Sequence, residues 1–153
     1  MTGKQQTDTW RLRTATPRDR EVALRLLREA DLPIAGVEDN FPAGYIVGET
    51  GDQVIAVAGM EKYGSFGLLR SLAVSPDWRR LGIGKALTER LLAFAWTISL
   101  EAVYVLTTAA QAYFAGKGFR RIDREDVPAE IRESVEFTGA CPANAICMVK
   151  EIL

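Results

Sequence analysis

The sequence contains no histidine, and this absence excludes several kinds of chemistry. It removes the commonest general base, the usual zinc ligand and any serine–histidine or cysteine–histidine nucleophile pair. A mechanism must therefore use carboxylates, tyrosine, cysteine, lysine, backbone groups or water, and we expect no metal cofactor. There are only two cysteines, Cys141 and Cys147. Without a secretory context we expect no disulfide between them.

Long apolar runs and an excess of charge of one sign are also missing. The net charge is −1 over 153 residues, so no global field draws the chain to nucleic acid or to an anionic membrane. No apolar run is long enough to span a bilayer, and the polar N-terminus does not resemble a signal peptide. We therefore expect a cytoplasmic protein with a single domain over residues 1–153, of which about residues 1–8 form a flexible N-terminus.

The stretch that organises the chain is residues 68–92, LLRSLAVSPDWRRLGIGKALTERLL. Residues 68–74 predict a strand, and Pro76 ends it because proline fixes φ and lacks an N–H donor. Apolar residues then recur at helical spacing. The stripe of this predicted helix is Ile83, Leu87, Leu91, Phe94 and Ile98.

The turn before this helix favours a polyanion such as a pyrophosphate. Glycines at positions 82 and 84 let a phosphate approach the backbone, where the N-terminus of a helix exposes unpaired N–H groups. Basic side chains surround the turn at Arg79, Arg80 and Lys85. The G-x-G-x-x-G and G-x-x-x-x-G-K-[ST] motifs are both absent. Taken alone, the turn could also be a surface turn whose glycines only permit tight packing.

The context of the turn resembles the acetyl-CoA motif of the GNAT superfamily of N-acetyltransferases. That motif is a strand ending in Val, here Val74, followed by Arg-x-x-Gly-x-Gly, here Arg79 to Gly84, which opens a helix. Residues 114–119, FAGKGF, resemble the later Tyr-x-x-x-Gly-Phe segment, with Phe114 in the place of Tyr. The resemblance implies acetyl-CoA as co-substrate. The residues that it implies as cofactor contacts are Leu72, Ala73, Val74, Arg79, Arg80, Leu81, Gly82, Ile83, Gly84, Lys85 and Phe114.

The resemblance also implies an α/β (α+β) fold with a mixed, mostly antiparallel central sheet flanked by helices. The sheet is expected to splay between its fourth and fifth strands, which exposes backbone groups to which the cofactor's pantetheine can bind like an added strand. The residues agree with this order of elements. Strands are predicted at 10–13, 45–49, 54–60, 68–74, 102–106, 119–123 and 145–152, helices at 17–30, 83–98, 109–116 and from 128, and a turn at 61–67.

Some local features resemble narrower groups within the superfamily. Residues 106–108 (LTT), Phe114 and a helix with Pro128 resemble the N-acetylglutamate-synthase-like branch. Residues 69–74 (LRSLAV), together with residues 106–108 and 136–148, resemble N-acetyltransferases encoded in bacterial arsenic-resistance operons. This resemblance implies transfer of acetyl to the amine of a small, amino-acid-like acceptor, and glutamate-like organoarsenicals are among the proposed substrates. It implies neither a nucleic-acid nor a membrane partner, and it leaves a homodimer open.

Several residues are candidates for the acceptor side of the site. Arg70 within the central strand either meets an internal carboxylate or faces a pocket and binds a substrate carboxylate. Glu61, at the end of the neighbouring strand, is the candidate general base, and an exposed strand-end charge is the alternative. The other candidate substrate contacts are Ser71, Thr107 and Thr108, and strand propensity alone would also explain the two threonines.

The expected catalytic acid is missing, which leaves other functions open. Phe114 cannot donate a proton to the CoA thiolate, and Tyr113 is turned about 100° away on a helix. Water or the ammonium intermediate would then protonate the leaving thiolate. One alternative function is an acetyl-CoA-binding sensor without turnover. Another is a metalloid-binding protein that uses Cys141 and Cys147.

Overall fold

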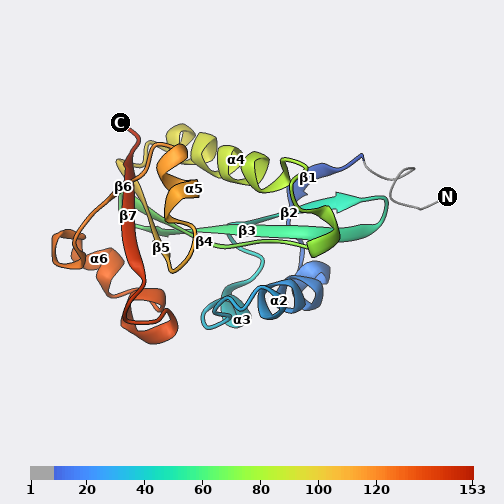
Figure 1. The fold of residues 1–153 in the computed structure, drawn as a ribbon, viewed down its shortest axis with the longest axis horizontal. Coiled ribbons are helices and arrows are strands. Elements are labelled where there is room, and N and C mark those ends of the chain that lie inside the picture. Colours follow the sequence, from blue (N-terminus) through green and yellow to red (C-terminus); the bar gives the residue numbers. More distant parts are fainter. Residues whose placement is uncertain (1–8) are drawn as a thin grey trace. The chain divides into compact units, whose positions relative to one another are not determined.

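The computed structural model describes residues 9–153, so the flexible terminus predicted for residues 1–8 lies outside the described part. Seven strands form a sheet in the order β1-β2-β3-β4-β5-β7-β6 (Figure 1). The β4–β5 pair is parallel, and the β1–β2, β2–β3, β5–β7 and β6–β7 pairs are antiparallel. The predicted mixed, mostly antiparallel sheet with flanking helices is confirmed.

The strands are β1 (Arg11–Thr14), β2 (Tyr45–Thr50), β3 (Gln53–Tyr63), β4 (Phe66–Val74), β5 (Ala102–Thr107), β6 (Arg120–Arg121) and β7 (Ile146–Glu151). The α-helices are α2 (Arg20–Glu29), α3 (Val37–Asn40), α4 (Ile83–Thr97), α5 (Gln111–Gly116) and α6 (Ala129–Arg132). Short 3₁₀ turns cover Pro17–Asp19, Pro76–Trp78 and Arg124–Asp126, and a π-type turn covers Glu136–Ala140. None of the helices within residues 9–153 is long and apolar enough to cross a membrane.

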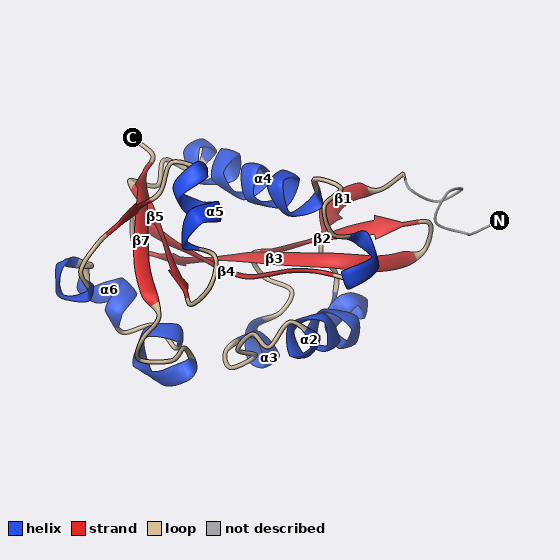
Figure 2. Ribbon diagram, viewed as in Figure 1, coloured by secondary structure: helices blue, strands red, loops and turns tan. Residues whose placement is uncertain are grey.

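The chain divides into two compact units, and β3, β4 and α4 each contribute to both. Figure 2 shows these two strands in red and this helix in blue. The described part of the first unit is residues 9–59 together with Ser71–Arg90. The second unit is Met60–Arg70 together with Leu91–Leu153. The candidate cofactor turn therefore belongs to the first unit, and Glu61 and Arg70 belong to the second.

In the first unit, the apolar stripe of α2 packs on one face of β2 and β3. Val47 and Val57 are paired in register and both lie in this core, which excludes water completely at these positions. The next pair, Gly48 and Ala56, points to the opposite face because side chains alternate along a strand. A Cβ added at Gly48 would lie 3.4 Å from Cγ2 of Ile83, so the start of α4 packs closely on that face.

In the second unit, α6 covers one face of β5 and β7. Ile131 of α6 is fully buried in a cluster with alternate residues of the two strands. Those strand residues are Ala102, Tyr104, Leu106, Cys147 and Val149. Beyond Leu68, which pairs with Tyr104, no further β4–β5 partners are found among the described residues. This short parallel pairing is the splay that was expected between the fourth and fifth strands.

Three local predictions are corrected by the structure. The turn predicted at residues 61–67 is shorter, because β3 continues to Tyr63 and Glu61 lies inside the strand. The strand predicted at 119–123 is only Arg120–Arg121. Phe94, predicted in the core stripe of α4, is 49% exposed, and the buried position of that turn is Ala95. Ala95 lies four residues after Leu91, a spacing that keeps it on the buried face.

A network of charges ties β1, β2 and the start of α2 together within the first unit. The Arg13 guanidinium donates to the Asp19 carboxylate at 2.8 and 3.0 Å, and its Nε donates to Glu49 at 2.8 Å. Asp19 also accepts from the backbone N–H of Thr16 at 2.8 Å. Hydrogen bonds from Arg13 lower the pKa of Asp19 to about 2, and they lower the pKa of Glu49 as well.

This network makes the stability of the fold depend on pH. The folded state depresses the pKa of Asp19, so the stabilisation is present above pH 4 and is lost as the pH falls toward 2. At pH 7, we expect Asp19→Asn to lower the free energy of unfolding by about 2 kcal/mol in urea titrations. The loss should shrink steadily below pH 4. Glu21→Gln, at an exposed site on the same helix, should cost less than about 0.5 kcal/mol. A loss of equal size at pH 7 and pH 2.5 would contradict this account.

Candidate functional site

The candidate cofactor turn begins where β4 ends and is latched to that end by its own arginine. The Nε of Arg79 donates a 3.0 Å hydrogen bond to the carbonyl oxygen of Val74. Trp78, one residue earlier, is buried and anchors the 3₁₀ turn. Arg79 is an exposed residue, and so is the next residue, Arg80. Two cationic side chains are thus presented at one end of a fixed strand.

The backbone of the turn adopts a left-handed conformation at two positions just before α4. Arg80 has φ +66° and Gly82 has φ +88°. No atom lies within 4 Å of a Cβ added at Gly82, so tight packing is not the reason for glycine at this position. The positive φ is a sufficient reason, since glycine adopts it without steric cost.

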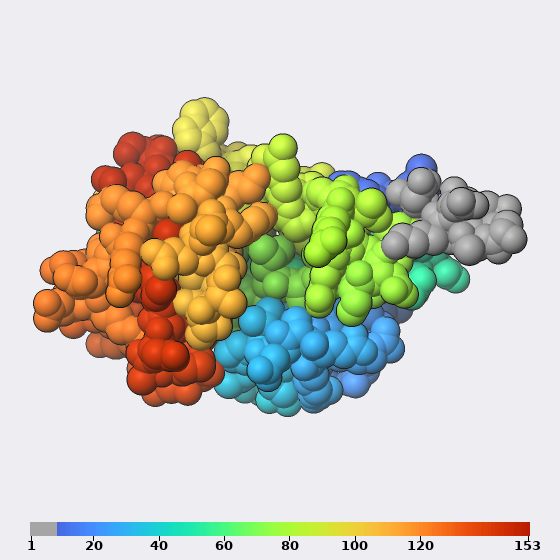
Figure 3. Space-filling view, in the orientation of Figure 1, coloured from blue at the N-terminus to red at the C-terminus, as the bar shows by residue number. Residues whose placement is uncertain are grey.

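Helix α4 then starts with its first turn at the molecular surface. Its first intrahelical hydrogen bond runs from the N–H of Ala86 to the carbonyl of Gly82 at 3.0 Å, so the preceding N–H groups point out of the helix end. Ile83 is buried and holds the helix, whereas Lys85 is exposed. In the space-filling view the lime-green atoms of this region form part of the visible surface (Figure 3). The turn can therefore be reached by an anion.

Strand β4 is kinked just before the segment predicted to bind pantetheine. Ser71 has φ +63°, a conformation that β-strand residues rarely adopt. Its Oγ lies 3.4 Å from the hydroxyl oxygen of Tyr45, and the Tyr45 ring lies over Gly59, where an added Cβ would come within 2.4 Å of it. Ala73 packs into the core of the first unit, and Leu72 and Val74 are only partly buried. The left-handed residue thus lies directly before the backbone of Leu72–Val74.

In the second unit, Arg70 joins two carboxylates in a buried cluster. Its side chain has no exposed surface. Its Nη1 lies 3.1 Å from Oε2 of Glu61, and its Nε lies 3.4 Å from Oε2 of Glu136. Tyr63 donates a 2.7 Å hydrogen bond from its hydroxyl to Oε1 of Glu61. The carboxylate of Glu136 interacts in turn with the thiol of Cys141.

Burial dominates the electrostatics of this cluster. It raises the pKa of Glu136 to about 7, against the opposing effect of the Arg70 charge and with a further increase from Glu61. It raises the pKa of Cys141 to about 12, and the charge of Glu136 contributes to that increase. The pKa of Tyr63 also lies above its usual value, because of burial first and then because of its hydrogen bond to Glu61. Glu136 is therefore the group of this cluster that titrates near neutral pH.

The other predicted site residues lie elsewhere in the second unit. Thr107 accepts a 2.9 Å hydrogen bond at Oγ1 from the N–H of Ala110 and so caps the loop before α5, while Thr108 is exposed. Phe114 is buried, with its ring centroid 5.4 Å from that of Phe119. Its neighbour Tyr113 packs edge-on against it at 5.1 Å.

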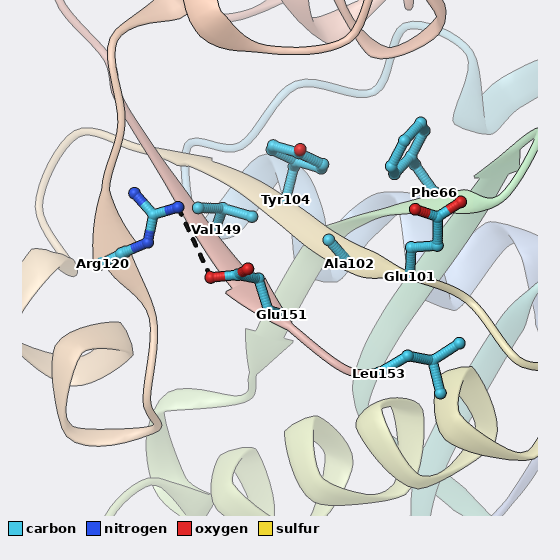
Figure 4. Close-up of a pocket in the computed structure, with 8 residues that line it drawn as sticks. All are labelled: Phe66, Glu101, Ala102, Tyr104, Arg120, Val149, Glu151 and Leu153. Atoms are coloured by element: carbon cyan, nitrogen blue, oxygen red, sulfur yellow. Dashed lines mark ion pairs between the residues drawn. The ribbon is translucent and has the colours of Figure 1, made fainter.

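A separate pocket of the second unit contains none of the predicted site residues (Figure 4). It has a volume of about 260 Å³ and lies where the ends of β4, β5, β6 and β7 meet. Arg120 and Glu151, 3.6 Å apart, form an ion pair at its rim. Its lining residues are Phe66, Glu101, Ala102, Tyr104, Arg120, Val149, Glu151 and Leu153.

Two members of the buried cluster were not predicted from the sequence as site residues. Glu136 stands between Val135 and Phe137. A single carboxylate between apolar residues is the sequence feature that could have indicated a buried, paired charge. No sequence feature indicated Tyr63 as a site residue, because the predicted turn at 61–67 placed it outside a strand. In β3 it lies two residues from Glu61, on the same face. Among residues 9–153, no three Cys, Asp or Glu side chains come together as a set that could hold a metal ion.

Comparison with known proteins agrees with the motifs in the turn. A family model described as the acetyltransferase (GNAT) family matches residues 6–119. Amino-acid acetyltransferase from Mannheimia succiniciproducens is 30% identical over 97 residues, which are 62% of this chain and 22% of that protein. Amino-acid acetyltransferase from Mycobacterium tuberculosis is 38% identical over 69 residues, 45% of this chain and 39% of that protein. The matched part thus spans well under half the length of these relatives.

Solved structures show the same fold at low identity. N-acetylglutamate synthase from Neisseria gonorrhoeae, complexed with coenzyme A and N-acetyl-glutamate, has a TM-score of 0.81 and 20% identity. The match covers 95% of this chain and 35% of that one. A Mycobacterium tuberculosis protein in complex with CoA has a TM-score of 0.76 and 24% identity, with 94% of this chain and 99% of that chain covered.

The buried cluster predicts a strong and pH-dependent effect of removing its cation. We expect Arg70→Met to lower the free energy of unfolding by about 3–5 kcal/mol at pH 8, because two carboxylates are then left near each other without their guanidinium. The loss should be smaller at pH 5, where protonation neutralises the stranded charge. Urea unfolding at both pH values measures it. Arg121→Met, on the exposed edge of β6, is the matched control. A loss that is the same at both pH values would show that packing alone is responsible.

Proposed function

Because the chain belongs to the acetyltransferase (GNAT) family, we propose that it transfers acetyl from acetyl-CoA to the amine of a small, amino-acid-like acceptor. The observation that carries this proposal is the turn at the start of α4. It combines exposed basic side chains, a left-handed glycine and outward-facing helix N–H groups at the end of a kinked strand. This combination suits a pyrophosphate better than any smaller or uncharged ligand.

We assign the parts of the cofactor to the turn and to the strand that leads into it. The N–H groups of the first turn of α4 and the side chains of Arg80 and Lys85 bind the pyrophosphate. The backbone of Leu72–Val74 binds the pantetheine as an added strand, since Ser71 turns it away from regular pairing. Arg79 positions the turn through its bond to Val74.

The reaction is attack by a neutral amine on the thioester carbonyl. The C–N bond forms, the tetrahedral oxyanion accepts a hydrogen bond from a backbone N–H within Leu72–Val74, and the C–S bond then breaks. One donor of this kind is worth roughly 3 kcal/mol of barrier, and holding the two reactants together contributes roughly 7–11 kcal/mol in favourable cases. The acceptor ammonium and acetyl-CoA become the acetamide and CoA thiol, with one proton released.

Glu61 is our candidate for the group that takes the first proton from the acceptor ammonium. It is the only carboxylate of the described β3 segment Met60–Tyr63. Its side chain is 16% exposed, whereas the side chain of Glu136 is 5% exposed. The leaving thiolate has no tyrosine at the position of Phe114, so it takes its proton from water or from the ammonium intermediate. The mechanism then needs one base and no dedicated acid.

The acceptor class is supported by the names of the relatives, which are amino-acid acetyltransferases. The resemblance to transferases of arsenic-resistance operons adds glutamate-like organoarsenicals as candidate acceptors. Arg70 is already engaged by two internal carboxylates, so we assign recognition of an acceptor carboxylate to other groups, of which Thr107 and Thr108 are candidates. Acetyl transfer to glutamate, other amino acids, glutamate-like arsenicals and polyamines, measured by CoA release, distinguishes these classes.

Binding of the cofactor is tested most directly at the turn. Lys85→Ala should weaken acetyl-CoA binding about tenfold in isothermal titration, because a charge-assisted hydrogen bond to phosphate is worth about 1.5 kcal/mol. Lys85 is exposed, so the melting temperature of the free protein should not change. Arg90→Ala, also exposed and further along α4, should bind normally. If wild-type protein does not bind acetyl-CoA, the assignment of the turn is wrong.

A further inference from the structure

We infer that Glu136 is a positioning residue for the proposed acetyl transfer, because it holds the one extra proton of a buried triad with Arg70 and Glu61 and thereby sets the strength of Glu61 as a base. The inference rests on the proposed function. The sequence predicted no role in the site for Glu136, and its role follows from the contacts of the folded second unit.

The charges of the triad do not balance when all its groups are ionised. The triad contains two carboxylates and one guanidinium, so it carries a net charge of −1 when all three groups are ionised. The side chains of Arg70 and Glu136 are 0% and 5% exposed, and an uncompensated charge at such a depth is costly. A single added proton makes the triad neutral. The low-cost state near neutral pH therefore has one protonated carboxylate.

The contacts of the two carboxylates determine which of them carries that proton. Glu61 has the closer contact with Arg70, 3.1 Å against 3.4 Å, and Oε1 of Glu61 also accepts the 2.7 Å bond from Tyr63. Hydrogen bonds to a carboxylate favour its charged form. Glu136 is more deeply buried, and its charged neighbours of opposite sign are limited to the same Arg70. The proton therefore resides on Glu136, while the Glu61 carboxylate keeps its contacts with Arg70 and Tyr63.

The proton on Glu136 affects catalysis through Arg70, which both carboxylates share. When Glu136 ionises, a second negative charge is added around Arg70, and Arg70 then stabilises the negative charge of Glu61 less. When Glu136 is protonated, Arg70 interacts mainly with Glu61 and weakens it as a base. The groups that face Glu136 are Arg70, Glu61, Cys141 and, at longer range, Tyr63. Of these, Cys141 and Tyr63 stay neutral at pH 7, so Arg70 and Glu61 set its charge.

The test is the pH profile of kcat/KM for acetyl transfer by wild type and by Glu136→Gln. Glutamine copies the protonated form in shape and stays neutral at every pH. We expect the two proteins to have similar kcat/KM near pH 6, and wild type to gain about threefold or more over the variant by pH 9. The profile of the variant should lack the inflection near neutral pH. Glu133→Gln, three residues earlier and exposed, is the control and should follow wild type.

A merely structural role for Glu136 gives a different result, in which Glu136→Gln lowers kcat/KM by the same factor at every pH. That outcome overturns the inference. Carboxyl-carbon NMR supplies a readout that does not need turnover. One side-chain carboxyl should titrate near pH 7 in wild type, should be missing in Glu136→Gln and should titrate at lower pH in Glu61→Gln. If no carboxyl titrates there, the inference is wrong even if acetyl is transferred. If wild type shows the titration but transfers acetyl to no amine, the proposed function fails instead.

Discussion

A guanidinium that has no exposed surface must be surrounded by compensating charge, and this constraint governs the second unit. Arg70 stands in the middle of β4, and its partners come from β3 and from the π-type turn that precedes β7. Glu136 lies sixty-six residues after Arg70 in the sequence, and its contact with Arg70 fixes the position of that turn. The turn, the end of β3 and the start of β4 are thus specified together by one buried cation, and the apolar cluster around Ile131 packs beside them.

The same strand carries the second constraint of the molecule. One residue after Arg70, the backbone at Ser71 enters a left-handed conformation, and the strand continues to Val74 before the cationic turn. A residue other than glycine in such a conformation costs free energy of the order of 1 kcal/mol or more. Strained positions of this kind persist where the surroundings hold them, and here the Tyr45 hydroxyl lies beside Ser71. The strain falls directly before the segment assigned to pantetheine.

Much of this architecture could be predicted from the sequence because it depends on short-range patterns. Pro76 predicted the end of β4 at Val74. The glycines at 82 and 84 and the helical spacing of the apolar residues predicted the start of α4 at Ile83. Phe94 was misplaced because a period of 3.6 residues leaves neighbouring positions at the edge of a helix face nearly equivalent, and packing chose Ala95.

The charged cluster could be predicted only in part. The composition of β4 showed that Arg70 would need a carboxylate or a pocket, but pairing over a long sequence separation is decided by tertiary contacts. Glu136 approaches through an irregular turn in which Gly139 has φ +148°, and no periodic pattern announces such a turn. The charged cluster around Arg70 is therefore the part of the molecule that the sequence predicted least completely.

The two thiols of the second unit have a consequence for how the protein can be handled. Burial raises the pKa of both Cys141 and Cys147 to about 12. At pH 7 very few molecules then carry a thiolate at either position, and the thiolate is the form that reacts with disulfide reagents. A chromogenic disulfide would consume the free CoA thiol far faster than the thiols of the protein. Turnover could thus be followed continuously, with the folded enzyme itself contributing almost no colour.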